Sequence, residues 1–150
     1  MAIQKPLTLI DGKKSRLPSS DLLEGPFVIP FEHIRNNTPI TTTSAAYVFL
    51  TGSRFTNPPA GTYLLSATVY VLLSNQRTSF TMGVFVGGVL LVDTDRQLFV
   101  DGNQTTDIRI TYSITVPVTV NGSQNVELRW LRSAGTATKQ NMDLTLLRVG

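Results

Sequence analysis

The chain contains no cysteine and only one histidine, His33, in 150 residues. The lack of cysteine excludes a disulfide framework, cysteine-ligated zinc, iron–sulfur clusters and thiol catalysis. A Ser-His-Asp triad or a two-histidine metal site would have to use His33, which lies in an irregular, proline-rich region. Neither a Gly-x-Ser-x-Gly elbow nor a phosphate-binding P-loop occurs. We therefore expect no catalytic residue, no metal and no cofactor, and a protein that is not an enzyme.

Long apolar runs and dense charge of one sign are also missing. No run approaches the roughly 20 apolar residues of a membrane helix, and the first residues lack the apolar region of a signal peptide. The 13 basic residues are interleaved with acidic ones, and only Lys13, Lys14 and Arg16 form a cluster. That cluster is too small to follow a phosphate backbone. We expect no membrane partner, no nucleic-acid partner and retention in the cytoplasm until assembly.

The acidic residues offer two further sites, and both have simpler interpretations. Asp93, Asp95, Asp101 and Asp107 flank two turns and could meet as calcium ligands, but an aspartate before glycine is typical of an ordinary turn. Glu127 is the only glutamate after residue 40, so a pair of glycosidase carboxylates is poorly supported. Because Glu127 shares a strand face with Arg129, we predict a solvated ion pair.

Residues 1–39 differ in composition from the remainder and contain five of the eight prolines. Proline at this density blocks helices and central strands, so we predict an extended N-terminal arm, followed by one body at residues 40–150. Apolar side chains on such a tether need a partner surface to offset the entropy lost on ordering. We expect the arm to dock through Leu7, Leu9, Ile10, Lys13, Lys14, Arg16, Leu17, Leu22 and Leu23.

From about residue 44 the sequence alternates between apolar and polar residues with a period of two, which indicates strands with one buried face. The clearest rows run from Ile108 to Val120 and from Tyr63 to Leu73. Trp130 alternates in phase with Val126 and Leu128, which favours a core position over a sugar-stacking platform. With turn signals between the strands and no helical segment, the pattern predicts an all-β antiparallel sandwich, most plausibly a jelly roll.

Several apolar residues fall on the opposite parity from the buried rows. A monomer would expose them unless a loop or the arm covers them, whereas a three-fold assembly would bury them against neighbouring chains. We predict a homotrimer with these residues at its interface: Leu64, Tyr70, Leu72, Phe85, Leu131 and Leu147.

Two segments resemble known families. Leu9-Ile10-Asp11-Gly12-Lys13, followed by Leu17-Pro18 and Asp21-Leu22-Leu23, is similar to the N-terminal segments of tailed-bacteriophage virion proteins. The run Gly61-Thr62-Tyr63 and the closing pair of strands resemble jelly rolls of the tumour-necrosis-factor/C1q type. The first resemblance implies an arm that docks on capsid or tail proteins, and the second implies a trimeric jelly roll.

These observations favour a non-enzymatic virion structural protein, assembled in the host cytoplasm, that acts as a capsid decoration (cement) protein or a fibre knob. The alternative is a carbohydrate- or receptor-binding tip of a tail fibre. That alternative needs aromatic side chains clustered in loops at one end, and the predicted loops carry mainly Asn, Ser, Thr and Gly. A bound glycan is thus possible but unsupported by the sequence.

Overall fold

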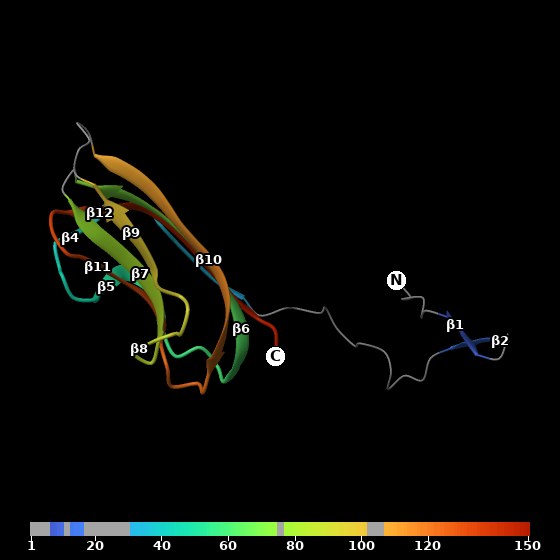
Figure 1. Ribbon diagram of the computed structural model, residues 1–150. Coiled ribbons are helices and arrows are strands. Elements are labelled where there is room, and N and C mark those ends of the chain that lie inside the picture. The colour runs from blue at the N-terminus through green and yellow to red at the C-terminus, as the bar shows by residue number, and fades with distance from the viewer. Residues whose placement is uncertain (1–6, 11–12, 17–30, 75–76, 102–106) are drawn as a thin grey trace.

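The computed structural model describes residues 7–10, 13–16, 31–74, 77–101 and 107–150, and every regular element in these ranges is a strand. Two short strands, β1 (Leu7–Ile10) and β2 (Lys13–Arg16), pair antiparallel. The remaining strands form two five-stranded antiparallel sheets that face each other as a sandwich (Figure 1). The predicted all-β fold is therefore confirmed. None of the described segments forms a helix long and apolar enough to cross a membrane.

The first sheet, called the β6 sheet below, has the strand order β10-β6-β12-β3, and β4 also pairs with β12. Its strands are β3 (Phe31–Asn36), β4 (Ile40–Thr42), β6 (Gly61–Leu73), β10 (Ile108–Val120) and β12 (Ala137–Arg148).

The second sheet, the β11 sheet, has the order β5-β11-β7-β8, with β9 also pairing with β7. Its strands are β5 (Val48–Phe55), β7 (Thr78–Val86), β8 (Val89–Leu90), β9 (Arg96–Val100) and β11 (Val126–Arg132). The chain passes from one sheet to the other between β5, β6 and β7 and again between β9, β10, β11 and β12, which is jelly-roll topology.

The core lies between the sheets and consists of the predicted alternating rows. From Tyr63 to Leu73 every second side chain of β6 is buried, and the intervening ones face outward. Trp130 is 1% exposed and meets the Phe80 ring edge-on, with the ring centroids 6.5 Å apart. Each large apolar side chain buried in this way contributes about 1.5–3 kcal/mol. Trp130 is therefore a core residue, as the alternation predicts.

The sheet takes in residues that the sequence assigned to the arm. β3 pairs with β12 from Phe31 opposite Leu147 to Asn36 opposite Met142. The fully buried Lys139 of β12 fixes the end of β3, because its Nζ donates hydrogen bonds to the carbonyl and Oδ1 of Asn36, at 3.1 and 3.0 Å, and to the carbonyl of Thr38. Among the described residues, the sandwich thus begins at Phe31.

Pro117 lies in the interior of the 13-residue strand β10, where proline is normally excluded. β10 is the edge strand of its sheet and has β6 as its neighbour. At an edge, the missing N–H of proline removes no sheet hydrogen bond if it faces outward. The edge position of β10 therefore makes Pro117 compatible with a long strand.

Candidate functional site

An apolar row crosses the outer face of the β6 sheet and takes one residue from each of four strands. Pro117 lies opposite Leu64, Leu64 opposite Leu147, and Leu147 opposite Phe31. Leu64 is 38% exposed and Phe31 is 65% exposed. Side chains directly opposite each other in a sheet are neighbours, so these four residues form a continuous apolar stripe.

Next to the stripe, the same face is rich in hydroxyl groups and poor in charge. The Ser66 hydroxyl lies 3.1 Å from that of Thr115, and the Thr68 hydroxyl 3.5 Å from that of Ser113. His33 Nε2 of the edge strand β3 lies 3.1 Å from Asp143 Oδ1 of the neighbouring strand β12, and both side chains are exposed. Asp143 lies opposite Thr68 of β6 in the register of the sheet. The hydroxyl side chains of β6 and β10 next to the stripe are thus neutral and short, whereas charge is present from β12 outward.

The structure divides the predicted trimer interface between two opposite faces of the sandwich. Four of the six predicted interface residues lie on the outer face of the β6 sheet: Leu64, Tyr70, Leu72 and Leu147. Phe85 and Leu131 lie on the outer face of the β11 sheet.

The outer face of the β11 sheet is built around Glu127, which is only 3% exposed. Its Oε2 accepts a hydrogen bond from Arg54 Nε at 2.6 Å, and its Oε1 lies 2.7 Å from Arg129 Nη2. Phe49 and Arg54 of β5 reach the same face because the register shifts around Gly52, whose φ of +83° favours glycine. The predicted Glu127–Arg129 ion pair is therefore present, but the prediction that it is solvated is wrong, because the carboxylate is buried beneath two arginines.

Aromatic rings cover the rest of the outer face of the β11 sheet around Glu127. Phe85 is 6% exposed, with the Tyr47 ring edge-on at 5.1 Å and the Arg129 guanidinium 4.7 Å from its centroid. The Arg54 guanidinium stacks on Phe49 at 4.4 Å. Burial, with a smaller contribution from Asp95, raises the pKa of Tyr47. Phe85 is thus covered by its own chain, and its burial requires no neighbouring molecule.

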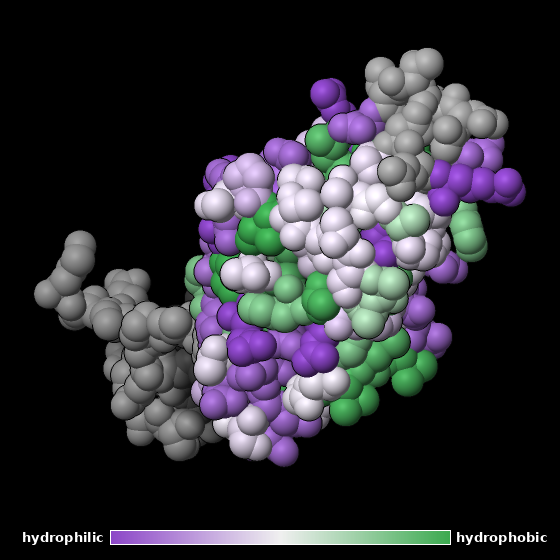
Figure 2. Space-filling view, turned by 90° about the vertical axis from the view of Figure 1, so that its left-hand side faces the viewer, coloured by the Kyte–Doolittle hydropathy of each residue, from purple (hydrophilic) through white to green (hydrophobic). Residues whose placement is uncertain are grey.

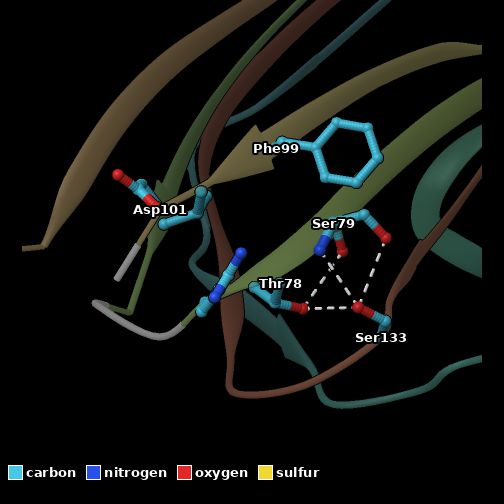
Figure 3. A pocket seen from close by; sticks show the side chains of 7 residues that line it. Thr78, Ser79, Phe99, Asp101 and Ser133 are labelled. Atoms are coloured by element: carbon cyan, nitrogen blue, oxygen red, sulfur yellow. Dashed lines mark hydrogen bonds between the residues drawn. The ribbon is translucent and has the colours of Figure 1, made fainter. Parts of the chain in front are cut away.

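A cleft of about 470 Å³ opens at the end of the sandwich where β7 begins and β9 ends (Figure 3). Phe99, which is 75% exposed, stands beside Ser79, its partner in the register of β9 and β7. Val100 is buried at its base. The other residues that line the cleft are Arg77, Thr78, Asp101 and Ser133.

A hydroxyl network fixes one wall of the cleft. Ser133 Oγ accepts hydrogen bonds from the backbone N–H of Ser79 at 3.0 Å and from its hydroxyl at 3.2 Å. Ser133 Oγ also lies 2.6 Å from Thr78 Oγ1, which accepts from the N–H of Ala134 at 2.7 Å. Since the Ser79 hydroxyl uses its single proton on Ser133, its lone pairs remain as acceptors.

Sequence reasoning did not single out Phe31 or Phe99 as surface residues, although it placed Pro117 on the outward face of its strand. Pro117 carried a signal, because it falls on the outward parity of an otherwise β-branched strand. Phe31 was placed in the arm, and Phe99 lies in the run Leu98-Phe99-Val100, where three consecutive apolar residues hide the alternation.

The remaining predicted sites have the following positions. Within the described ranges, no group of three or more His, Asp or Glu side chains is arranged to hold a metal ion. Of the predicted docking residues, Leu7, Leu9, Ile10, Lys13, Lys14 and Arg16 lie in β1 and β2. Leu17, Leu22 and Leu23 lie outside the described residues.

Figure 2 shows the side of the molecule that lies to the left in Figure 1. Apolar side chains gather there in separate patches, with hydrophilic side chains between them. Isolated patches of this kind are normal on a soluble domain. A row that crosses four strands, as on the outer face of the β6 sheet, is less usual.

The jelly-roll fold is shared with proteins of very different sequence. No protein-family model matches the chain, and no curated protein matches it in sequence. The chain is similar to Eiger TNF from S. frugiperda, with 10% identity, a TM-score of 0.51 and coverage of 81% of this chain and 94% of that one. It is also similar to the protein of infectious bursal virus-derived T=1 particles, with 12% identity, a TM-score of 0.50 and coverage of 97% of this chain and 36% of that one.

A third similarity, to the tripod from the baseplate of bacteriophage Tuc2009, has 13% identity and covers 100% of this chain and 84% of that one, with a TM-score of 0.45. At such identities the first two comparisons establish the fold alone.

Proposed function

We propose that this chain is a non-enzymatic structural protein of a bacteriophage virion. Its jelly-roll body assembles as a homotrimer, and its N-terminal arm docks it on the capsid, as a decoration protein, or on the tail. The observation that carries the proposal is the apolar row on the outer face of the β6 sheet, in which Pro117, Leu64 and Phe31 are exposed and Leu147 is half-buried. A continuous apolar stripe on a soluble domain marks a surface that another molecule covers.

The chemistry of this face suits further copies of the same chain. Around a symmetry axis each residue near the axis meets its own copies, so a charged side chain there would face like charges. The part of the face formed by β6 and β10 carries hydroxyls, including Ser66 and Thr68, while Asp143 and His33 lie on β12 and β3. A cyclic assembly whose axis passes near β6 and β10 can therefore bury the Leu64 end of the row without bringing like charges together.

The arm supports attachment to a larger particle. Its apolar residues Leu7, Leu9 and Ile10 lie close in sequence to the basic residues Lys13 and Lys14, a composition suited to an acidic partner surface with apolar pockets. The similarity of residues 9–23 to phage virion proteins makes capsid or tail proteins the proposed partners. The fold is also that of a protein from virus particles, which supports the proposal without identifying the partner.

Light scattering after gel filtration tests the trimer. The full chain should elute as a trimer at micromolar concentration, and Leu64→Ser should be a monomer with a cooperative thermal transition. Val89→Ser is the matched control, because Val89 is 71% exposed and lies outside the row. A wild-type chain that remains monomeric, or a control that dissociates equally, would contradict the proposal.

Two truncations test the arm. Removal of residues 1–30 keeps β3, so the protein should stay folded and trimeric. It should no longer bind to virus particles prepared without this protein. Removal of residues 1–39 also deletes β3 and the Asn36 and Thr38 acceptors of Lys139, and should lower the melting temperature. If the shorter truncation still binds particles, the docking function belongs to the body.

A further inference from the structure

We infer that the cleft at the end of the sandwich binds a neutral saccharide, with one sugar ring stacked on Phe99. This inference concerns a different surface from the apolar row and does not depend on the oligomeric state. It rests on three features: an exposed ring, a fixed acceptor beside it, and two side chains of opposite charge in the same cleft.

Phe99 is a large apolar side chain that the described part of its own chain leaves open to solvent. It lies on β9 with 75% of its surface accessible, while its register partner Ser79 is small and leaves the ring face uncovered. The electron-rich face of an aromatic ring attracts polarised C–H bonds, and one face of a pyranose ring presents a set of these. A ring held on a strand rather than on a loop also loses little conformational entropy when it binds.

The wall beside the ring is suited to a ligand that donates hydrogen bonds. The Ser79 hydroxyl is fixed by its bond to Ser133 Oγ at 3.2 Å, and Ser133 in turn is fixed by Thr78 at 2.6 Å. No donor among the described residues is bonded to Ser79 Oγ, so a sugar hydroxyl can donate to its lone pairs. Because the network holds the acceptor in place before binding, little ordering cost remains.

The charges of the cleft favour a neutral ligand. Arg77 and Asp101 both line it and are both exposed, and no salt bridge within the described ranges involves either of them. An arginine donates hydrogen bonds and a carboxylate accepts them, so together they can bind sugar hydroxyls both as acceptors and as donors. Their opposite signs give the cleft no net preference for an acidic glycan. An apolar peptide is less suited, since one ring is the only large exposed apolar side chain in the cleft.

The position of the cleft is compatible with this role. Residues 1–30 join the sandwich at Phe31, which shares the row of Leu64 near the start of β6. The cleft lies beyond the other end of β6, where Ser74 pairs with Thr136 and Ser133 with Ser79. The stretch of β6 from Leu64 to Leu73 spans about 30 Å. If the arm holds the protein on a particle, the cleft lies at the end far from that junction.

The test uses the full chain on an array of printed neutral and sialylated oligosaccharides, followed by calorimetric titration with the best neutral oligosaccharide in free form. The wild type should bind neutral glycans, Phe99→Ala should weaken binding at least about tenfold, and Phe99→Trp should retain it. Ser79→Ala should weaken binding several-fold. Val89→Ala is the control, because this exposed valine pairs with Val86 at the other end of β7 and should bind like the wild type.

Each outcome either supports or excludes a saccharide site at Phe99. Binding that depends on Phe99 supports it, provided that Phe99→Ala keeps the wild-type melting temperature and oligomeric state. The absence of binding to any neutral glycan, binding to sialylated glycans alone, or equal binding by Phe99→Ala would overturn it. Gel filtration of the same samples reports separately on the trimer, so a failed trimer and a failed saccharide site are distinguishable.

Discussion

The outer face of the β11 sheet is covered by its own side chains, whereas the outer face of the β6 sheet leaves an apolar row open to solvent. On the first face, two arginines and the Tyr47 ring enclose Glu127 and Phe85. On the second, short hydroxyl side chains flank Leu64 and cannot reach over it. Both sheets bury alternate residues in the same core. The comparison shows that the position of an apolar residue in the inward–outward alternation does not by itself decide whether another molecule must cover it.

The largest effect should come from the self-covered face. Phe85→Ala removes a ring that is 6% exposed and leaves a cavity beneath Tyr47 and Arg129, so we expect the free energy of unfolding to fall by about 3 kcal/mol. Leu64→Ala, on the open face, should lower the stability of the isolated monomer by less than about 1 kcal/mol while weakening the trimer. Urea unfolding of each variant, over a range of protein concentrations, separates the two contributions. Equal losses in monomer stability would remove the distinction between the faces.

A hydrogen bond from a buried tyrosine links the two sheets. Tyr112 of β10 donates a hydrogen bond from its hydroxyl to the carbonyl of Thr94, at 3.2 Å, across the sandwich. Burial raises the pKa of Tyr112 to about 12 from 10.0, so the folded state keeps a proton that the unfolded state releases. The stability from this difference is fully present below pH 10 and is lost as pH rises through about 12.

Two pKa units correspond to roughly 2–3 kcal/mol. Over this alkaline range, the wild type should therefore lose about that much more stability than Tyr112→Phe. Tyr70→Phe, on the outer face, is the control and should follow the wild type. Identical alkaline profiles for the wild type and Tyr112→Phe would show that this hydroxyl is not the group involved.

The smallest expected effect compares the ion pairs of the two faces. Glu127→Gln weakens two charge-assisted hydrogen bonds at a buried carboxylate, and we expect a loss of about 1–2 kcal/mol because both arginines can regain water. Asp143→Asn disrupts the exposed pair with His33 and should change stability by no more than about 0.5 kcal/mol. Thermal denaturation at neutral pH measures both, and a larger loss for Asp143→Asn would reverse the ranking.

The sequence predicted the fold well because period-two alternation is a direct consequence of strands with one buried face. The rows from Tyr63 to Leu73 and around Trp130 are buried as predicted. Strand β3 was missed because the flanking Pro30 and Pro39, together with the charged residues of the segment Phe31–Asn36, look like an arm. Only pairing with β12 makes this segment a strand. The hairpin β1–β2 carried a local signal, the Asp11-Gly12 pair between two short segments, that the proline content obscured.

The surfaces were less predictable, since exposure depends on neighbours that are distant in sequence. Phe85 and Leu64 share the same outward parity, yet only Phe85 meets Tyr47 and Arg129. The burial of Glu127 depends on Arg54, which is 73 residues away and reaches it only because of the bulge at Gly52. The cleft beside Phe99 likewise combines three strand ends that no local pattern connects.

The way β3 joins β12 has a mechanical consequence. Tension on residues 1–30 enters the sandwich at Phe31, and a pull away from the body separates the backbone pairs in sequence, from Phe31–Leu147 to Asn36–Met142. Such unzipping breaks one pair at a time and therefore needs little force at each step. At the far end, the separating strand reaches the buried ammonium of Lys139, which holds Asn36 and Thr38 together. The hydrogen bonds of Lys139 are therefore the last contacts of β3 to break under tension. Lys139→Met should lower the force at which β3 detaches from β12.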